Sequence, residues 1–419
     1  MKLSKMSRIH FTYVIIITIL FFSNIVLAQN ENEKTNNTYS YELGPAPGTY
    51  ELLEKDKKII IPFEFYKNKF RFKSEIKGKT YNMMLDNGTL WDDLLFFGSP
   101  KIDSAGFNLT EETQFGMTKA DLDTNVTVAL KNLVFKNQKV VVSRYDKNRP
   151  NMWEGFDGQF SATFFKHFVV RINFDDLFIE LIPPEKFQYS GNGQEFEMKI
   201  GPFNTRTISA DITLENEKTT SIDLLIDIGG LHPVYLPLGK YENITLPSKS
   251  IEGGLGSGFF NTKGYMARIK NISFGSYNLE NALTAFTPVE KETDIFGNTM
   301  IGLPLLKRFN VIFNYFENKI ILEPSKFYKD SFMYNITGLR FRPDRNGNLT
   351  ITKVYPNSPA SKSNIMENDI ITKINDVPIE DFKNGEIKSL LSMEGGIIKL
   401  DLLRDNKSLS VELKLQDIL

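Results

Sequence analysis

Residues 83–88 read MMLDNG and residues 224–229 read LLIDIG, and these two stretches decide the fold of the 419-residue chain. In each, an aspartate follows an apolar run and a glycine stands two residues further on. This pattern predicts a buried strand that enters a tight turn, because glycine tolerates positive φ and lets backbone N–H groups approach the carboxylate. A single Asp-x-Gly occurs in many ordinary turns. The interpretation therefore depends on how the two copies are related.

A second pair of similar stretches has the same spacing as the first pair. Residues 160–170 read FSATFFKHFVV and residues 301–311 read IGLPLLKRFNV, so both pairs are offset by 141 residues. A shared offset between two separated motifs favours an internal duplication over a coincidence between two β-rich stretches. Two related lobes are therefore predicted. A pseudo-twofold axis between them would bring Asp86 and Asp227 face to face.

Two carboxylates in contact can cleave an amide without a metal ion or a cofactor. They cannot both ionise comfortably, so one holds a proton while the other is charged. The charged group can take a proton from water, and the protonated group can donate to the carbonyl oxygen under attack. The chain has no cysteine, and His10, His167 and His232 lack the spacing of metal ligands. We therefore expect no metal and no cofactor.

These motifs resemble those of the retropepsin-like (clan AA) aspartic proteases, in the duplicated single-chain form with a C-terminal PDZ domain that bacteria export. Residues 85–89 (LDNGT) and 226–230 (IDIGG) match the family's Asp-Thr/Ser-Gly motif, and Ile301-Gly302 matches its later hydrophobic-Gly segment. Phe160-Ser161 is a weakened counterpart of that segment. The resemblance covers most of residues 46–419. It implies a mainly β fold, in which two pseudo-symmetric retropepsin-like acid-protease lobes precede a small PDZ-like β/α domain.

The resemblance also implies an active site. Asp86 and Asp227 would be the catalytic pair, and the residues of the two active-site loops would be Asn87, Gly88, Thr89, Ile228, Gly229 and Gly230. In the family the residue after each aspartate is Thr or Ser, whose hydroxyl locks the loops together. Here Asn87 can still form hydrogen bonds but Ile228 cannot, and a loosened site loses rate steeply. Two functions stay open: an aspartic-type endopeptidase, and a catalytically degenerate peptide-binding protein.

Members of the family cover the cleft with a glycine-rich hairpin flap. Residues 252–258 read EGGLGSG, so Gly253, Gly254, Gly256 and Gly258 form the candidate flap of the second lobe. A plain flexible loop is the alternative. In the first lobe, residues 114–117 (QFGM) are the candidate counterpart of this flap.

The last part of the chain resembles PDZ domains of the kind associated with bacterial proteases. The resemblance rests on residues 338–341 (GLRF), 357–362 (NSPASK) and 368–375 (NDIITKIN). PDZ domains add an extended peptide to a sheet edge, with backbone N–H groups receiving its C-terminal carboxylate. By resemblance that carboxylate loop would be Gly338, Leu339, Arg340 and Phe341. The alternative is that these residues are simply the first strand, and residues 386–391 are the expected flanking helix.

The N-terminus predicts export. Lys2, Lys5 and Arg8 precede an apolar run at residues 11–22, and small residues lead to Gln29, as in a cleaved secretory signal peptide. A retained membrane anchor is the rival interpretation, but the run is shorter than the ~20 residues of a spanning helix. The expected location is periplasmic, cell-envelope or secreted. The predicted divisions are a signal peptide (1–28), a disordered spacer (29–45), a first lobe (46–190), a second lobe (191–330) and a PDZ-like domain (331–419).

The charge balance bears on partners. Lys plus Arg number 50 and Asp plus Glu number 51, for a formal net charge of −1. This balance gives no electrostatic footprint for nucleic acid. The expected partners are a peptide or protein substrate and a C-terminal peptide at the PDZ-like domain, with the chain a monomer that contains an intramolecular pseudo-dimer.

Overall fold

The computed structural model describes residues 48–55, 57–66, 68–88, 94–109, 111–115, 118–143, 155–201, 205–254, 263–288, 299–343, 348–382 and 386–419. All of them belong to one compact unit, Pro45–Leu419. The predicted signal peptide (1–28) and spacer (29–45) lie outside the described residues. No helix within the described residues combines the length and the apolar character needed to cross a membrane.

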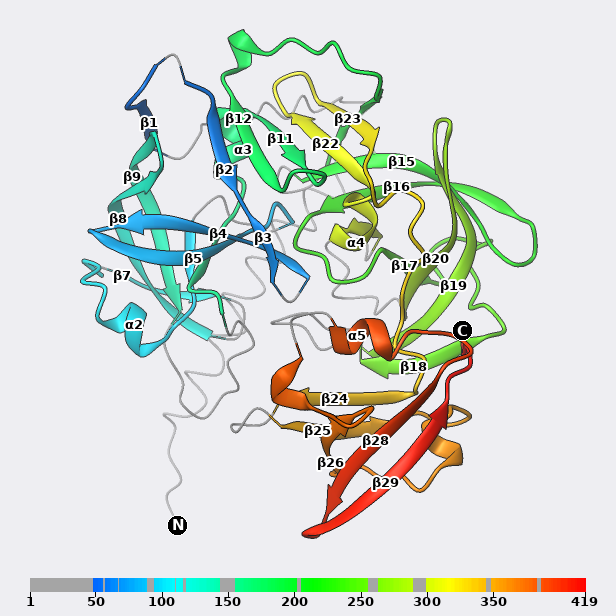
Figure 1. Cartoon of the computed structure of the whole chain (residues 1–419). Coiled ribbons are helices and arrows are strands. Elements are labelled where there is room, and N and C mark those ends of the chain that lie inside the picture. The colour runs from blue at the N-terminus through cyan, green and yellow to red at the C-terminus, as the bar shows by residue number, and fades with distance from the viewer. Residues whose placement is uncertain are drawn as a thin grey trace, which may run out of the picture. The chain divides into compact units, whose positions relative to one another are not determined.

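Within the described residues the chain forms four β-sheets (Figure 1), which confirms the prediction of a mainly β protein. The helices are short. They are α2 (Pro100–Asp103), α3 (Thr163–His167), α4 (Leu303–Leu306), α5 (Glu386–Leu390) and the 3-10 turns η1 (Pro184–Lys186), η3 (Ala360–Lys362) and η4 (Ile379–Asp381).

The first sheet has the strand order β1-β9-β6-β10-β5-β4-β8-β7, with β3 paired to β4. Its strands are β1 (Thr49–Leu52), β3 (Glu64–Tyr66), β4 (Lys69–Ile76), β5 (Lys79–Leu85), β6 (Leu94–Phe96), β7 (Glu111–Phe115), β8 (Thr118–Leu130), β9 (Leu133–Ser143) and β10 (Gly158–Phe160). Strand β5 lies between β4 and β10, and its last three residues, Met83, Met84 and Leu85, are all buried. A continuous apolar run is what a strand covered on both faces requires.

The second sheet has the order β14-β15-β16-β21-β17-β20-β19-β18. Its strands are β14 (Lys199–Ile200), β15 (Arg206–Thr213), β16 (Thr219–Asp227), β17 (Val234–Leu238), β18 (Ser250–Gly254), β19 (Lys263–Phe274), β20 (Tyr277–Pro288) and β21 (Met300–Gly302).

Strand pairing in the two sheets repeats with the offset found in the sequence. In the first sheet β5 pairs in parallel with β10, so that Leu85 lies opposite Phe160. In the second sheet β16 pairs in parallel with β21, so that Ile226 lies opposite Ile301. Ile226 follows Leu85 by 141 residues, and Ile301 follows Phe160 by the same number. The internal repeat is therefore a repeat of structure as well as of sequence.

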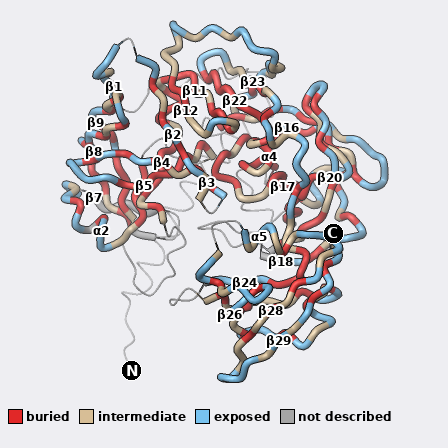
Figure 2. Tube along the Cα trace, in the orientation of Figure 1, coloured by how far each residue is buried: buried red, intermediate tan, exposed pale blue. Residues whose placement is uncertain are grey.

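A third sheet, which we call the shared sheet, takes strands from both repeats in the order β13-β23-β22-β11-β12-β2. Buried residues are concentrated along its central strands in Figure 2. The strands are β2 (Ile59–Pro62), β11 (Val169–Asn173), β12 (Phe178–Ile182), β13 (Gln194–Glu197), β22 (Phe309–Asn314) and β23 (Lys319–Pro324).

The register at the centre of the shared sheet is that of a twofold axis. Strands β11 and β22 are antiparallel, and Arg171 pairs with Ile312, its own counterpart 141 residues later. Val170 pairs with Phe313, and Ile172 pairs with Val311, so each residue faces the counterpart of the other. This reciprocal pairing is the mark of a self-complementary contact.

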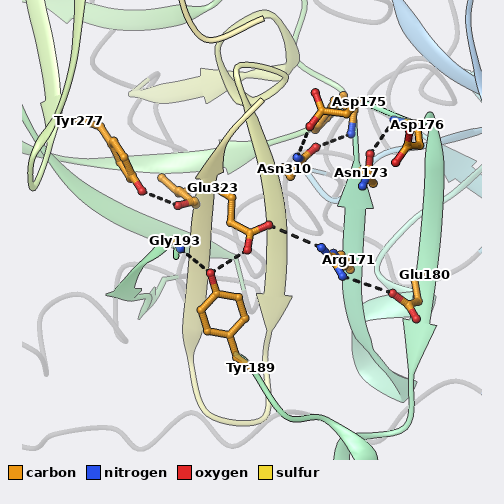
Figure 3. Close-up of polar contacts among 12 residues, drawn as sticks. Arg171, Asn173, Asp175, Asp176, Glu180, Tyr189, Gly193, Tyr277, Asn310 and Glu323 are labelled. Carbon is orange, nitrogen blue, oxygen red and sulfur yellow. Dashed lines mark hydrogen bonds and ion pairs between the residues drawn. The ribbon is translucent and has the colours of Figure 1, made fainter. Parts of the chain in front are cut away.

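Polar side chains reinforce this sheet (Figure 3). Arg171 lies 3.8 Å from Glu180 of the same repeat and 3.7 Å from Glu323 of the other. Asn310 donates to Asp175 (2.6 Å) and accepts from the backbone N–H of Phe174 (2.7 Å). The two repeats are thus joined by side-chain bonds as well as by the β ladder.

The fourth sheet lies at the C-terminus, with order β24-β25-β26-β28-β29 and β27 paired to β26. Apolar residues from its strands and from the segments around them form a separate core cluster. Its strands are β24 (Leu339–Pro343), β25 (Leu349–Val354), β26 (Ile370–Ile374), β27 (Val377–Pro378), β28 (Ile397–Arg404) and β29 (Lys407–Lys414).

Candidate active site

The two Asp-x-Gly turns have the same internal hydrogen bond. The Gly88 N–H donates to Asp86 Oδ1 (3.0 Å), and the Gly229 N–H donates to Asp227 Oδ1 (2.7 Å). The backbone N–H of Asp86 also donates to the carbonyl of Phe160, at the end of β10 (2.9 Å). Each carboxyl group is therefore fixed by its own turn.

The turns approach so closely that each glycine lies against the opposite carboxyl group. A Cβ atom added at Gly88 would overlap the Asp227 carboxyl, and one added at Gly229 would overlap the Asp86 carboxyl. The side chains of Asp86 and Asp227 are hydrogen-bonded to each other. Both keep partial exposure. The structure thus brings the two aspartates together, and glycine is required at both positions by close approach.

The environment changes how the pair ionises. Burial, followed by the negative charge of Asp86, raises the pKa of Asp227 to about 8. Burial also raises the pKa of Asp86, opposed by the positive charge of Lys69 and by the Gly88 N–H. Two carboxyls in contact titrate as a pair. At neutral pH the arrangement favours a proton on Asp227.

The Asn87 side chain forms hydrogen bonds from the first turn to the backbone of the second. Its Oδ1 accepts a hydrogen bond from the Ile228 N–H (2.8 Å). Its Nδ2 donates to the Ile226 carbonyl (3.1 Å) and to the Tyr315 hydroxyl (3.2 Å). The side chain is 7% exposed. The sequence raised the concern that Ile228 would loosen the site, but a single amide supplies both the donor and the acceptor of the link. Ile228 is itself buried, at 1% exposure.

The loop after Asp227 is closed by backbone contacts. The Leu303 N–H donates to the Gly230 carbonyl (3.2 Å), and a Cβ at Gly230 would lie 2.9 Å from Gly302. The N–H groups of Leu231 and His232 donate to the Tyr235 hydroxyl. Burial, with the positive charge of Lys388, lowers the pKa of His232 to about 4, so its ring is neutral near pH 7.

Sequence reasoning missed two positions near the pair. Lys69 donates from Nζ to the Gly229 carbonyl (2.8 Å), and Tyr315 contacts Asn87 while its ring lies 4.5 Å from the Arg206 guanidinium. Neither belongs to a motif. The Asn314-Tyr315 step does fall in the repeated register, which is the one signal that could have drawn attention to Tyr315.

The structure describes only some of the other residues that were predicted to line or cover the site. Thr89, Gly256, Gly258 and Gly116-Met117 lie outside the described residues. Gly253 and Gly254 end β18, where they pair with Gly264 and Lys263 of β19. Gln114 and Phe115 end β7 and pair with β8 in the same manner. Both glycine-bearing segments therefore adjoin the ends of antiparallel strand pairs. No group of three or more His, Asp or Glu side chains among the described residues could hold a metal ion.

The predicted peptide-binding residues lie at the start of the C-terminal sheet. Gly338 has φ of 76° and is buried, and a Cβ there would overlap Ser358. Leu339, Arg340 and Phe341 belong to strand β24, whose partner in the described sheet is β25. The stretch is thus both a glycine turn and the first strand of the sheet, so the two alternatives are compatible.

Comparison with known proteins identifies this C-terminal part. The family model described as PDZ domain matches residues 337–415. Residues 337–415 form a PDZ domain. The predicted flanking helix is α5, which ends at Leu390. No curated protein matches the chain.

Removal of the Asn87 amide should weaken the contact between the repeats. We expect Asn87→Ala to lower the free energy of unfolding by about 1–3 kcal/mol, because the buried Ile228 N–H and Ile226 carbonyl lose a partner. Asn87→Thr should cost less, since its hydroxyl can donate or accept. Urea unfolding measures both variants. Equal stability of Asn87→Ala and the wild type would contradict the assigned role.

The raised pKa of Asp227 predicts a dependence of stability on pH. Folded Asp227 titrates at about 8 and the ordinary value is 3.8, so between these pH values the folded state binds the extra proton. Stability therefore falls as the pH rises through this window. In Asp227→Asn the side chain at position 227 cannot ionise. We therefore expect the free energy of unfolding of this variant, measured by urea unfolding, to fall less steeply with rising pH than that of the wild type.

The matched control for this titration is Asp223→Asn. Asp223 lies on the same strand, β16, but its side chain is exposed and paired with Lys199. This change should leave the fall between the two pH values in place. Parallel curves for Asp227→Asn and the wild type would show that Asp227 does not retain its proton in the folded state.

Proposed function

We propose that this protein is an exported, retropepsin-like aspartic endopeptidase with duplicated lobes, in which Asp86 and Asp227 activate a water molecule against a peptide bond. One observation carries the proposal: the two carboxyls are hydrogen-bonded to each other across the twofold axis of the repeat. Their partial exposure leaves room for contact with a substrate.

The unequal environments of the two groups support distinct roles. Asp227, with its pKa raised to about 8, is the group that holds the proton, and Asp86 is the carboxylate. Asp86 removes a proton from water as the water oxygen bonds to the carbonyl carbon, while Asp227 donates its proton to the carbonyl oxygen. Asp86 then passes its proton to the amide nitrogen as the C–N bond breaks. Asp227 recovers a proton from the hydroxyl, which restores the starting state.

Two further features fit this function. The strand pairs β18–β19 and β7–β8 end in the segments predicted as flaps, which could cover an extended substrate. The PDZ domain suggests peptide binding, and we propose that it binds the C-terminus of a substrate or partner at the edge of β24. A non-catalytic protein that holds peptides in the same cleft is the alternative function, because a PDZ domain would suit that role equally well.

Cleavage of a denatured protein substrate tests the catalytic proposal. We expect the purified full chain to cleave it, with inhibition by pepstatin, and Asp86→Asn and Asp227→Asn to lower kcat/KM by about 10²–10⁴-fold, the contribution typical of a positioned acid or base. Asp223→Asn is the matched control and should keep its activity. If Asp227→Asn cleaved the substrate as fast as the wild type, the aspartate pair would not be the catalytic site. Peptide binding without cleavage would favour the alternative function.

Two glycines of the PDZ domain give a matched test of peptide binding. Gly338 and Gly395 have φ of 76° and 77°, but a Cβ would overlap Ser358 at Gly338 and meets nothing within 4 Å at Gly395. We expect Gly338→Ala to weaken binding of peptides with a free C-terminal carboxylate at least about tenfold, the equivalent of 1.4 kcal/mol. Fluorescence polarisation measures this, with amidated peptides as the ligand control. Equal losses in Gly338→Ala and in the control Gly395→Ala would assign the effect to backbone strain alone.

A further inference from the structure

We propose that Lys69 is the counter-charge of the Asp86–Asp227 pair, and that it sets the pH range over which the pair holds a single proton. This inference deepens the proposed function, on which its catalytic consequences rest. The effect of Lys69 on the titration of the two carboxyls can be measured whether or not the chain cleaves peptides.

Lys69 extends from the first repeat to the Asp-x-Gly turn of the second. It is the first residue of β4 in the first sheet, and its side chain is 8% exposed. Its Nζ donates to the carbonyl of Gly229, 160 residues away, at 2.8 Å. Gly229 is the residue that lies against the Asp86 carboxyl and whose N–H binds Asp227. The ammonium group is therefore bonded to the turn that touches both carboxyls.

The charges at this point interact in both directions. The positive charge of Lys69 lowers the pKa of both carboxyls, and it is the largest influence that opposes burial at Asp86. Burial lowers the pKa of Lys69, and the two aspartates oppose that effect. One ammonium, one carboxylate and one protonated carboxyl sum to zero charge. Neutrality is the state that a buried site favours, because an uncompensated buried charge is costly.

Other titratable groups around the pair do not supply this charge. Tyr235 on β17 is neutral, since burial raises its pKa, and His232 is neutral with a pKa of about 4. Tyr315 lies against Asn87, and the Arg206 guanidinium lies over the Tyr315 ring. Among the described residues, Lys69 is the cation whose charge acts on both aspartates.

Lys69 also breaks the symmetry of the site. Phe72 of β4 pairs with Met83, and Ile208 of β15 pairs with Leu224, the counterpart of Met83. Counting back three residues from each places Thr205 as the counterpart of Lys69. By this count, the second repeat has a neutral residue at the strand position that Lys69 occupies in the first. The two carboxyls, although related by a twofold axis, therefore have different electrostatic surroundings.

Carbon-13 NMR of the full chain labelled at aspartate Cγ tests the inference directly. Asp86→Asn and Asp227→Asn assign the two signals. We expect Lys69→Met to raise the titration midpoint of Asp86 by at least about one pH unit, the lower bound for loss of a close opposite charge, and to raise that of Asp227 as well. Lys69→Gln removes the charge but can still donate to Gly229, and should act in the same direction.

Two further variants make the result decisive. Lys69→Arg keeps the charge and should leave both midpoints close to those of the wild type. Lys199→Met removes the exposed cation paired with Asp223 and should move neither. Unchanged midpoints in folded Lys69→Gln, with the fold checked by circular dichroism, would overturn the proposal. If Lys69→Met fails to fold, Lys69→Gln carries the test.

Kinetics separate this inference from the proposed function. If the chain cleaves peptides, both limbs of the kcat/KM profile should move to higher pH in Lys69→Gln. Shifted carboxyl midpoints in a chain that cleaves nothing would support the counter-charge and contradict the peptidase. Shifted limbs without shifted midpoints would contradict the counter-charge.

Discussion

The close approach of two Asp-x-Gly turns is the constraint on which the rest of this structure depends. Gly88 lies against the Asp227 carboxyl and Gly229 against the Asp86 carboxyl, so a side chain at either position would force the pair apart. The shared sheet places the turns at this distance, since β11 and β22 pair about a twofold axis between Arg171 and Ile312. Strand β5 ends at Leu85, immediately before Asp86, and β16 ends at Asp227, so each carboxyl group lies where a strand enters its turn.

The polar groups around this symmetric backbone are not symmetric. The Asn87 side chain both donates and accepts across the contact between the turns, whereas Ile228, its counterpart, contributes a backbone N–H and an apolar side chain. Lys69 faces the pair from one repeat only, as judged by its counterpart Thr205. A duplicated chain can diverge in this manner because each copy needs to supply half of a site. Two chemically identical carboxyls can thereby acquire different proton affinities.

Much of this arrangement could be predicted from the sequence, because it depends on short-range patterns and one offset. Apolar runs ending in Asp-x-Gly placed Asp86 and Asp227 at strand ends, and the 141-residue spacing placed them together. Lys69 could not be found in that way, since its bond to Gly229 depends on how a hairpin of one repeat packs on the other. The role of Asn87 was underestimated for a related reason: whether one amide can replace two hydroxyls is a question of side-chain geometry.

Neutron diffraction from crystals of the deuterium-exchanged protein near neutral pH would show which carboxyl group holds the proton, because it locates hydrogen isotopes directly. We expect one deuteron between the Asp86 and Asp227 carboxyls, bound to Asp227, with a fully deuterated ammonium at Lys69. Two deuterons on the pair, none on either carboxyl, or carboxyls too far apart to share a hydrogen bond would contradict this expectation.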